Sequence, residues 1–500
     1  MSTTSLSQKE SRNIFATLTI VFATLGSITY GYCSCIIATM LSQTSFTGYM
    51  GLQRATNATQ LSGAINALYQ VGALFGTLSS GYTSDRFGRR KAIFLACIMV
   101  IIGGGLQAGS VHVAMFMAAR FITGIGIGNL VTLIPTWQAE LSNPHSRGLL
   151  VGLHGTFILV GYSSASWIGF GFSYVTNSHV QWRIPLLFQV IPPLILASGI
   201  FFVPESPRWL LQQGREAEAL AVCKKIRRDS SAPDDGYAIA EFSSMKAQYQ
   251  YDLTMPSSWA SIFSVRSYRR RAFIGFSCLF LAQCTGTQVI NNYGPTIYAS
   301  LGFNAKEQQL LAAGWITAGI PANFISALLM DKTGRVRMMQ FGFLATGIAL
   351  LGTTTSVAVG TSTGNTAALK AAVFFIYLHI ATYGSGLDAP TYVYGTEIWP
   401  NHLRAKGAAI SISGLFVGAL ILLMGASTAF ATIGWKYYLV FLVMTVIAVV
   451  VSLLFYVEVN GLSLEQTAKV FGDHVEVPEV HVYKEDSNSS NSQSDIVTKA

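Results

Sequence analysis

Charged residues are scarce in this chain of 500 residues: Asp, Glu, Lys and Arg together make up 11% of it. Soluble domains carry about 25% charged residues, so this scarcity excludes an ordinary soluble enzyme or a soluble multidomain protein. Hydrophobic residues reach 51%, and the mean hydropathy is +0.45. The composition therefore predicts a polytopic membrane protein.

Cysteine is also sparse, and the patterns that hold cofactors are missing. The six cysteines, five of them within or next to apolar runs, form neither a secreted disulfide framework nor the paired spacing of a metal site. No GxxxxGK(S/T) sequence occurs, so ATP-driven chemistry has no support. The formal charge of +9 is scattered between apolar runs and forms no basic face. We therefore expect no metal, no cofactor and no nucleic-acid partner.

Long apolar runs are what the sequence has instead. Core helices of soluble proteins are amphipathic and usually shorter than the roughly 20 residues that cross a bilayer, whereas these runs are apolar on all sides. The prediction is an all-α membrane protein with twelve transmembrane helices in two pseudo-symmetric six-helix bundles. The spans are expected at residues 14–38, 60–82, 92–109, 114–137, 149–171, 184–203, 273–299, 309–330, 339–358, 371–395, 408–430 and 436–457.

The distribution of Lys and Arg predicts the orientation of these spans. The clusters RFGRRK, KKIRR and RRR fall in alternate loops, and the positive-inside rule places those loops in the cytosol together with both chain termini. The first 13 residues lack the basic start and the cleavage site of a signal peptide, so the first span is expected to be retained. An opposite loop carries Asn57-Ala58-Thr59, which is either a glycosylation site at Asn57 or a chance tripeptide. We expect a multi-pass protein of the plasma membrane.

The two halves of the chain repeat each other. Asp85 and Arg89 follow the second span as Asp331 and Arg335 follow the eighth, 246 residues later. A repeat of half the chain is typical of transporters that hold their substrate between two bundles near the bilayer midplane. The predicted units are a cytosolic segment at 1–13, a six-helix bundle at 14–203, a cytosolic linker at 204–271, a second bundle at 272–458 and a largely disordered cytosolic tail at 459–500.

Ordered motifs carry a resemblance to a known family. From Tyr30 to about Glu465 they include GYTSDRFGRRK, RFITGIGIG, PTWQAELSNPHSRG, PESPRWL and GTEIWPNHLRAKG. This set resembles the sugar porter family of the major facilitator superfamily, and specifically its fungal members. The resemblance implies a transporter, not an enzyme, that moves a sugar, a polyol or a similar small polar molecule across a lipid bilayer by alternating access. Two alternatives stay open: transport or export of a nonsugar metabolite, and a nonconducting nutrient sensor.

Charged residues at the cytosolic helix ends form the first candidate set. Carboxylates there can accept hydrogen bonds from arginines, and pairs that form together only when the cytosolic side is shut would bias a two-state equilibrium. The alternative is a set of solvated charges that only determine topology. The set comprises Asp85, Arg89, Glu140, Arg147, Glu205, Arg208, Asp331, Arg335, Glu397 and Arg404, in which we expect pairs between Glu140 and Arg147, Glu205 and Arg208, and Glu397 and Arg404.

Amides and aromatic rings form the second candidate set. Amides donate and accept hydrogen bonds and so satisfy hydroxyl groups, while an aromatic face suits the apolar side of a sugar ring. The alternative is that the amides bond to neighbouring helices. Gly155, where the family typically has Gln, and Ala419 are expected to widen the site. The predicted substrate-binding residues are Gln283, Gln288, Asn291, Asn292, Tyr293, Tyr392 and His154.

The first span lacks the acid that proton-coupled relatives commonly carry in the sequence GYD. Here the aligned residue is Cys33, in YGYCSC, while Arg120 of the fourth span remains. A neutral thiol cannot relay a proton, so we expect either facilitated diffusion or coupling through Asp388. Asp388 is expected within the tenth span, on one helix face with Gly384 and Tyr392, unless it lies shallower or pairs with Arg120. The small residues beside it are expected to let that helix flex.

Overall fold

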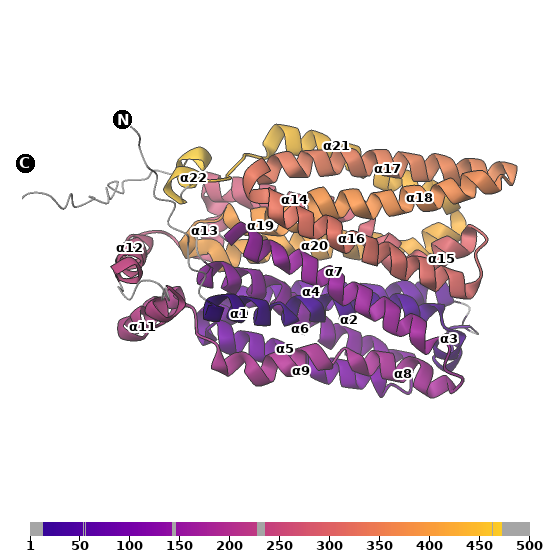
Figure 1. The fold of residues 1–500 in the computed structure, drawn as a ribbon, viewed down its shortest axis with the longest axis horizontal. Helices are drawn as coiled ribbons and strands as arrows, with labels where there is room; N and C mark the ends of the chain where they lie inside the picture. The colour runs from indigo at the N-terminus through magenta and orange to yellow at the C-terminus, as the bar shows by residue number, and fades with distance from the viewer. Residues whose placement is uncertain are drawn as a thin grey trace, which may run out of the picture.

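The computed structural model describes residues 14–53, 55, 57–142, 147–227, 236–462 and 464–472. Within these ranges the chain consists of helices and connecting loops, without a β-strand. Figure 1 shows the long helices running along one axis, with the N-terminal half in indigo and magenta below the orange and yellow C-terminal half. The predicted all-α membrane fold is confirmed: ten described segments are long and apolar enough to cross a membrane. Each of the twelve expected spans falls on a helix or on a helix broken in two.

The first half of the chain begins with two short helices that together make the first span. Helices satisfy their main-chain hydrogen bonds internally, which the interior of a membrane requires. The elements are α1 (Ile14–Ala23), α2 (Leu25–Ser42), α3 (Thr44–Tyr49), α4 (Ala58–Phe87), α5 (Arg89–Ala108), α6 (Val113–Leu141), α7 (Arg147–Phe172), α8 (Ser178–Phe188), α9 (Ile191–Gly199) and the 3-10 turn η2 (Ile200–Phe202).

The second half repeats this arrangement, with breaks in its first and fourth spans. Its elements are α14 (Arg266–Cys284), α15 (Thr287–Ser300), α16 (Ala305–Thr333), α17 (Arg335–Thr363), α18 (Thr366–Tyr383), the π-helical turn η3 (Gly384–Asp388), α19 (Ala389–Glu397), η4 (Asn401–Leu403), α20 (Arg404–Thr432), η5 (Gly434–Lys436) and α21 (Tyr437–Phe455).

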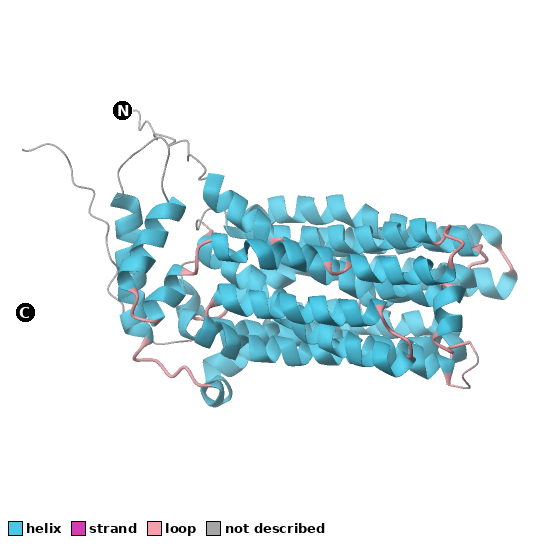
Figure 2. Cartoon of the chain, turned by 90° about the horizontal axis from the view of Figure 1, so that it is seen from below, coloured by secondary structure: helices cyan, strands magenta, loops and turns pink. Residues whose placement is uncertain are grey.

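Short helices occupy the linker between the halves. They are α10 (Pro207–Gln212), α11 (Glu216–Arg227), α12 (Gly236–Asp252) and α13 (Trp259–Ser264), and α22 (Leu464–Phe471) follows the last span. Figure 1 places α11, α12, α13 and α22 together at one end of the long helices, and Figure 2, seen from below, shows short helices at that end. The expected cytosolic segment 1–13 lies outside the described residues, as does the predicted disorder beyond residue 472.

Glycines allow the helices of the first half to pack closely. A Cβ atom added to Gly31 of α2 would lie 2.0 Å from the main-chain oxygen of Ile158 in α7. One added to Gly128 of α6 would lie 1.9 Å from the main-chain oxygen of Ala73 in α4. Neither position has room for a side chain, and such small-residue contacts are how membrane helices approach each other.

Two kinds of surface remain on the packed helices. Between the halves, α4 lies along α20, α7 along α16, and α2 against α15, and this interface is where a substrate site is expected. Away from it, large apolar side chains are exposed, as they are on a surface that faces lipid. On α17 and α21 these include Leu344, Ile348, Leu351, Val443, Val446 and Val450.

Candidate functional site

The seventh span is broken between two of the predicted site residues. Gly286 has a φ of +84°, which favours glycine, and an added Cβ would lie 2.5 Å from an aromatic ring of α21. The main-chain oxygen of Thr285 at the break lies 3.1 Å from Nε2 of His379 in α18. Gln283 therefore lies at the end of α14 and Gln288 at the start of α15, on either side of the break. Interrupted helices of this kind commonly line binding sites in transporters.

Gln288 connects the two halves of the molecule. Its Nε2 donates to the hydroxyl of Tyr162 in α7 at 2.7 Å and lies 3.5 Å from the hydroxyl of Tyr30 in α2. The main-chain and side-chain oxygens of Gln288 accept from Nδ2 of Asn292 at 2.9 and 3.4 Å. Tyr30 also packs edge-on against Phe416 of α20, with ring centroids 6.3 Å apart. These groups form one polar and aromatic cluster that both halves share.

Asn291 and Tyr293 also contact the first half. Sγ of Cys35 in α2 donates to Oδ1 of Asn291 at 3.4 Å and lies 3.2 Å from Oγ of Ser166 in α7. Nδ2 of Asn66 in α4 lies 3.5 Å from the hydroxyl of Tyr293, which donates to a main-chain oxygen of α20 at 3.4 Å. Cys35, which the sequence did not mark as a site residue, is thus a thiol at the interface between the halves.

His154 and Tyr392 meet across the same interface. Nδ1 of His154 in α7 lies 2.7 Å from Oγ of Ser27 in α2. The ring of Tyr392 in α19 packs edge-on against the imidazole, with centroids 5.3 Å apart. The structure therefore brings these two predicted residues into direct contact.

Three polar atoms of the predicted site residues have no hydrogen-bond partner in the described part of the chain. They are Oε1 of Gln283, whose Nε2 donates to the hydroxyl of Tyr383 at 3.3 Å, Nδ2 of Asn291 and Nε2 of His154. All three atoms are buried. Buried polar groups normally find a partner, so each exception needs an explanation. Each is a group to which a polar ligand held between the halves could hydrogen-bond.

Gly155 lies against an amide of the second half. A Cβ atom added there would lie 3.2 Å from Oδ1 of Asn323 in α16. Asn323 therefore borders the position that a side chain at residue 155 would take, and the widening of the site by Gly155 stays a prediction. Sequence analysis missed Asn323, although an amide inside the apolar eighth span was an available signal.

Asp388 is buried, with 6% of its surface exposed. Its Oδ2 accepts a hydrogen bond from Nδ2 of Asn323, so the alternative of a pair with Arg120 is excluded. Asp388 ends the π-helical turn η3, and a straight helical wheel therefore does not describe its face. A Cβ atom added to Gly386 would lie 2.4 Å from Cα of Gly342 in α17. The glycine beside Asp388 thus allows close helix packing.

The helix ends of the first half that lie beside the linker are joined by a buried ion pair. Nε and Nη2 of Arg89 donate to the two carboxylate oxygens of Glu140 at 3.0 and 2.8 Å, and Nη1 lies 3.9 Å from Asp85. This geometry pairs Glu140 with Arg89, whereas the side chain of Arg147, its expected partner, lies outside the described residues. A bidentate arginine–carboxylate pair is strong when it is buried and complete.

Glu205 caps a helix. Its carboxylate accepts hydrogen bonds from the two main-chain NH groups that open α5, at 3.0 and 3.2 Å. The predicted pair between Glu205 and Arg208 is therefore wrong. A carboxylate at a helix N-terminus instead satisfies NH groups that have no partner within the helix. Burial raises the pKa of Glu205, and the main-chain donors oppose that shift. Burial likewise raises the pKa of Asp85, and the positive charge of Arg89 opposes this shift.

The second half repeats both features. Nε of Arg335 donates to Glu397 at 3.1 Å, and its Nη2 donates to Asp331 at 2.8 Å. Glu458 accepts from the two NH groups that open α17, at 3.1 and 3.0 Å, as Glu205 does in the first half. Sequence analysis missed Glu458, although it follows Glu205 by 253 residues, close to the period of the repeat.

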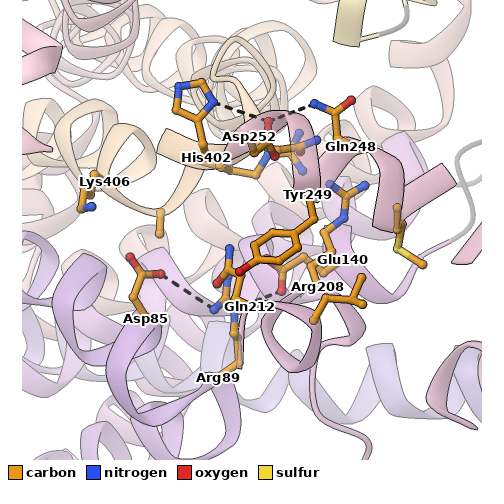
Figure 3. A pocket seen from close by; sticks show the side chains of 15 residues that line it. Asp85, Arg89, Glu140, Arg208, Gln212, Gln248, Tyr249, Asp252, His402 and Lys406 are labelled. Carbon is orange, nitrogen blue, oxygen red and sulfur yellow. Dashed lines mark hydrogen bonds and ion pairs between the residues drawn. The ribbon is translucent and has the colours of Figure 1, made fainter. Parts of the chain in front are cut away.

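A small cavity of about 60 Å³ lies where the linker meets the ends of both halves. Figure 3 shows Gln248, Tyr249 and Asp252 of α12 facing the charged residues of the helix ends. Oδ1 of Asp252 lies 3.7 Å from Nδ1 of His402. The linker therefore contacts both halves at this end. The other charged residues that line the cavity are Asp85, Arg89, Glu140, Arg208, Arg404 and Lys406.

Asn57 lies at the opposite end of α4 from Asp85. It is exposed and immediately precedes α4. Ala58 and Thr59, the other two residues of the tripeptide, lie in the first turn of that helix.

Comparisons with known proteins agree over nearly the whole chain. Residues 19–471 match the family model described as sugar (and other) transporter. The MFS-type transporter criB of Aspergillus cristatus is 32% identical over 459 residues, which cover 91% of this chain and 93% of that protein. The sugar transporter STL1 of Saccharomyces cerevisiae is 29% identical, covering 90% and 81%. A quinate permease of Neurospora africana is 29% identical, covering 90% and 87%.

Solved structures share the fold. The MFS proton:xylose symporter XylE bound to 6-bromo-6-deoxy-D-glucose has a TM-score of 0.80 at 23% identity, covering 91% of this chain and 99% of that chain. The inward-open conformation of the xylose transporter XylE from E. coli has a TM-score of 0.70 at 22% identity, covering 91% and 100%.

Proposed function

The chain belongs to the sugar porter family of the major facilitator superfamily, and we propose that it carries a sugar, a polyol or a similarly sized polar molecule by alternating access. The proposed location is the plasma membrane, with the linker and both termini in the cytosol. The arrangement of basic clusters in alternate loops supports this orientation.

The observation that carries the proposal is the buried polar cluster between the halves. Gln288 of α15 donates to a tyrosine of the first half, and His154 of the first half packs on Tyr392 of the second. Three buried polar atoms of the predicted site residues lack a partner among the described residues. Amides and aromatic rings together match the hydroxyl groups and the apolar face of a polyhydroxylated ring. We assign Gln283, Gln288, Asn291, Asn292, Tyr293, Tyr392 and His154 to substrate binding.

Transport is proposed to proceed without a proton carrier in the first span. Cys33 occupies the place of the acid that proton-coupled relatives commonly have, and a neutral thiol cannot transfer charge to Arg120. Facilitated diffusion is therefore the primary proposal. Proton coupling through Asp388 is the second, because this buried carboxylate forms no ion pair within the described ranges.

A nonsugar metabolite is the second candidate for the substrate. Ala419 and Phe416 of α20 leave this side of the cluster apolar. Relatives whose names specify other substrates, such as the quinate permease, cover nearly the same length of chain. The experiment is therefore an uptake screen in a transport-deficient host, with labelled hexoses, pentoses, polyols and polyhydroxy acids.

The screen distinguishes three functions: sugar or polyol transport, transport of a nonsugar metabolite, and a nonconducting sensor. Uptake of a sugar or polyol that Gln288→Ala abolishes at normal surface expression supports the primary proposal. Uptake or efflux restricted to a polyhydroxy acid selects the nonsugar metabolite. Specific binding without flux, in cells and in proteoliposomes, would instead support a nonconducting sensor.

A further inference from the structure

A chain of three polar side chains crosses the interface between the halves beside the candidate substrate site. Oγ1 of Thr156 in α7 donates to Oδ1 of Asn323 in α16 at 3.1 Å. Nδ2 of Asn323 in turn donates to Oδ2 of Asp388, at the end of η3. One amide therefore links a hydroxyl of the first half to the carboxylate of the second.

This chain lies in the protein interior. The exposed fraction is 0% for Asn323, 6% for Asp388 and 7% for Thr156. Asn323 is also confined sterically: its side chain lies against Gly155 of α7, and its main-chain nitrogen faces Gly384 of η3. A change in the orientation of this amide would therefore alter contacts with both α7 and η3.

Among the described residues, no cation pairs with Asp388 to hold its charge. No ion pair is formed by Asp388 among the residues that the structure describes. The titratable groups facing it are tyrosines from α2, α7, α18 and α19, together with the His154 ring that packs on one of them; the tyrosines are Tyr30, Tyr162, Tyr383 and Tyr392. The amide of Asn323 is thus the principal donor to this carboxylate.

We propose that Asn323 is a positioning residue that transmits the protonation of Asp388 to the first half through Thr156. The inference rests on the proposed alternating-access transport but not on the identity of the substrate. It also holds for facilitated diffusion, where it makes the rate of opening depend on pH without linking net proton movement to flux.

The chemistry of the amide supplies the mechanism. An amide has one oxygen that accepts and one NH₂ group that donates, whereas an ionised carboxylate can only accept. With Asp388 ionised, NH₂ faces the carboxylate and the oxygen faces Thr156, as in the structure. When Asp388 takes a proton from water in an open state, the Asn323 amide turns over, so that its oxygen accepts from the new OH of Asp388 and its NH₂ points toward Thr156. The Thr156 hydroxyl must then accept from that NH₂ and give its own hydrogen to another acceptor.

The test is substrate exchange in proteoliposomes with equal pH on both sides, measured from pH 5 to 8. The parent protein should show a single pH midpoint, and Asp388→Asn should abolish it. Asn323→Leu removes the donor that favours the carboxylate, so the midpoint should move upward by about one pH unit or more, with KM changed less than about twofold. Thr156→Val should keep the midpoint and reduce the amplitude of the pH effect.

Asn129→Leu is the matched control. Asn129 is a buried amide of α6 that also bonds a threonine hydroxyl, Thr83, at 3.3 Å, away from Asp388. This variant should have the pH profile of the parent protein. A flat parent profile, or an Asn323→Leu midpoint equal to that of the parent, overturns the inference while leaving transport itself intact.

A second measurement is independent of transport. The infrared band of a protonated carboxyl group, followed against pH in the purified protein, should lose one component in Asp388→Asn. That component should titrate at higher pH in Asn323→Leu than in the parent. If no substrate is exchanged, the proposed function fails, and the infrared titration still decides whether Asn323 controls Asp388. Size-exclusion chromatography verifies that each variant is folded.

Discussion

Nη1 of Arg120 donates a hydrogen bond to the main-chain oxygen of Cys33 at 2.8 Å, and its guanidinium lies 4.1 Å from the ring centroid of Tyr69. This arginine is 1% exposed and forms no ion pair within the described ranges. A carbonyl dipole and an aromatic face thus take the place of a carboxylate beside it. A main-chain carbonyl does not ionise, and a tyrosine hydroxyl ionises only in alkaline solution, at an ordinary pKa of about 10, so neither group changes charge near neutral pH. This contact therefore cannot by itself link proton movement to conformational change.

Proteoliposomes with substrate outside and an imposed inward proton gradient test this directly. We expect equilibration across the membrane, without accumulation above equilibrium, and no effect of a protonophore. Cys33→Asp, which places a carboxylate next to Arg120, is the gain-of-function variant, and Cys33→Ser is its neutral control. Accumulation that a protonophore abolishes and Asp388→Asn retains would contradict both coupling proposals, whereas loss of accumulation in Asp388→Asn with binding retained would select Asp388 as the coupling group.

Gln283→Ala should raise the apparent KM for the substrate by about tenfold or more, because a substrate group left unpaired in a buried site costs about 1–3 kcal/mol. Transport assays at matched surface expression measure this. Gln107→Ala is the control, since Gln107 is a buried glutamine that donates to Thr123 at 2.7 Å within the first half. An unchanged KM for Gln283→Ala would remove Gln283 from the site.

Glu397→Gln should slow net flux more than it weakens binding. The change removes the negative charge of Glu397, whose Oε2 lies 3.1 Å from Nε of Arg335. It thereby weakens contacts that are proposed to favour the cytosol-closed state. Arg404→Ala should act in the same direction, because Arg404 lines the cavity between the linker and the two halves. Flux and equilibrium binding measured on one preparation give the comparison. If both equal those of the parent protein, these charges determine topology alone.

Arg89→Ala should lower the melting temperature strongly, because it leaves the carboxylate of Glu140 buried without its partner, at a cost of about 3–5 kcal/mol. The double variant Arg89→Met/Glu140→Met should recover part of the loss, since it removes both charges. Arg215→Ala, at an exposed pair with Glu218, should leave the melting temperature unchanged. A thermal unfolding assay in detergent ranks all four proteins.

Asn57→Gln should lower the apparent mass on a gel by that of one N-linked glycan when the protein is produced in a eukaryotic host. The exposed position of Asn57 before α4 supports this expectation. Treatment with an endoglycosidase should remove the difference between parent and variant. Equal mobility before treatment would show that the tripeptide is not used.

The sequence predicted the twelve spans and the half-chain repeat because these depend on local properties. Each apolar run crosses the membrane whatever its neighbours are, and every expected span corresponds to a helix or a broken helix. The same holds for Gln288 and Asn291: their amides were visible as polar residues within an apolar run. Predictions that required a partner fared worse. Glu205 accepts hydrogen bonds from the main-chain NH groups that open α5 and does not pair with Arg208.

Only the tertiary structure decided which polar residues are hydrogen-bond partners. Gln288 meets Tyr162 across 126 residues of sequence, and Asn323 meets Thr156 across 167. Such contacts depend on how far each helix is rotated about its axis and where it is broken, and neither quantity is encoded in hydropathy. The break at Gly286 and the π-helical turn that ends at Asp388 shift the faces of α15 and α19 away from a straight helical wheel. The sequence alone thus determined a membrane transporter with polar groups in its core, and packing between the halves decided which of those groups face one another.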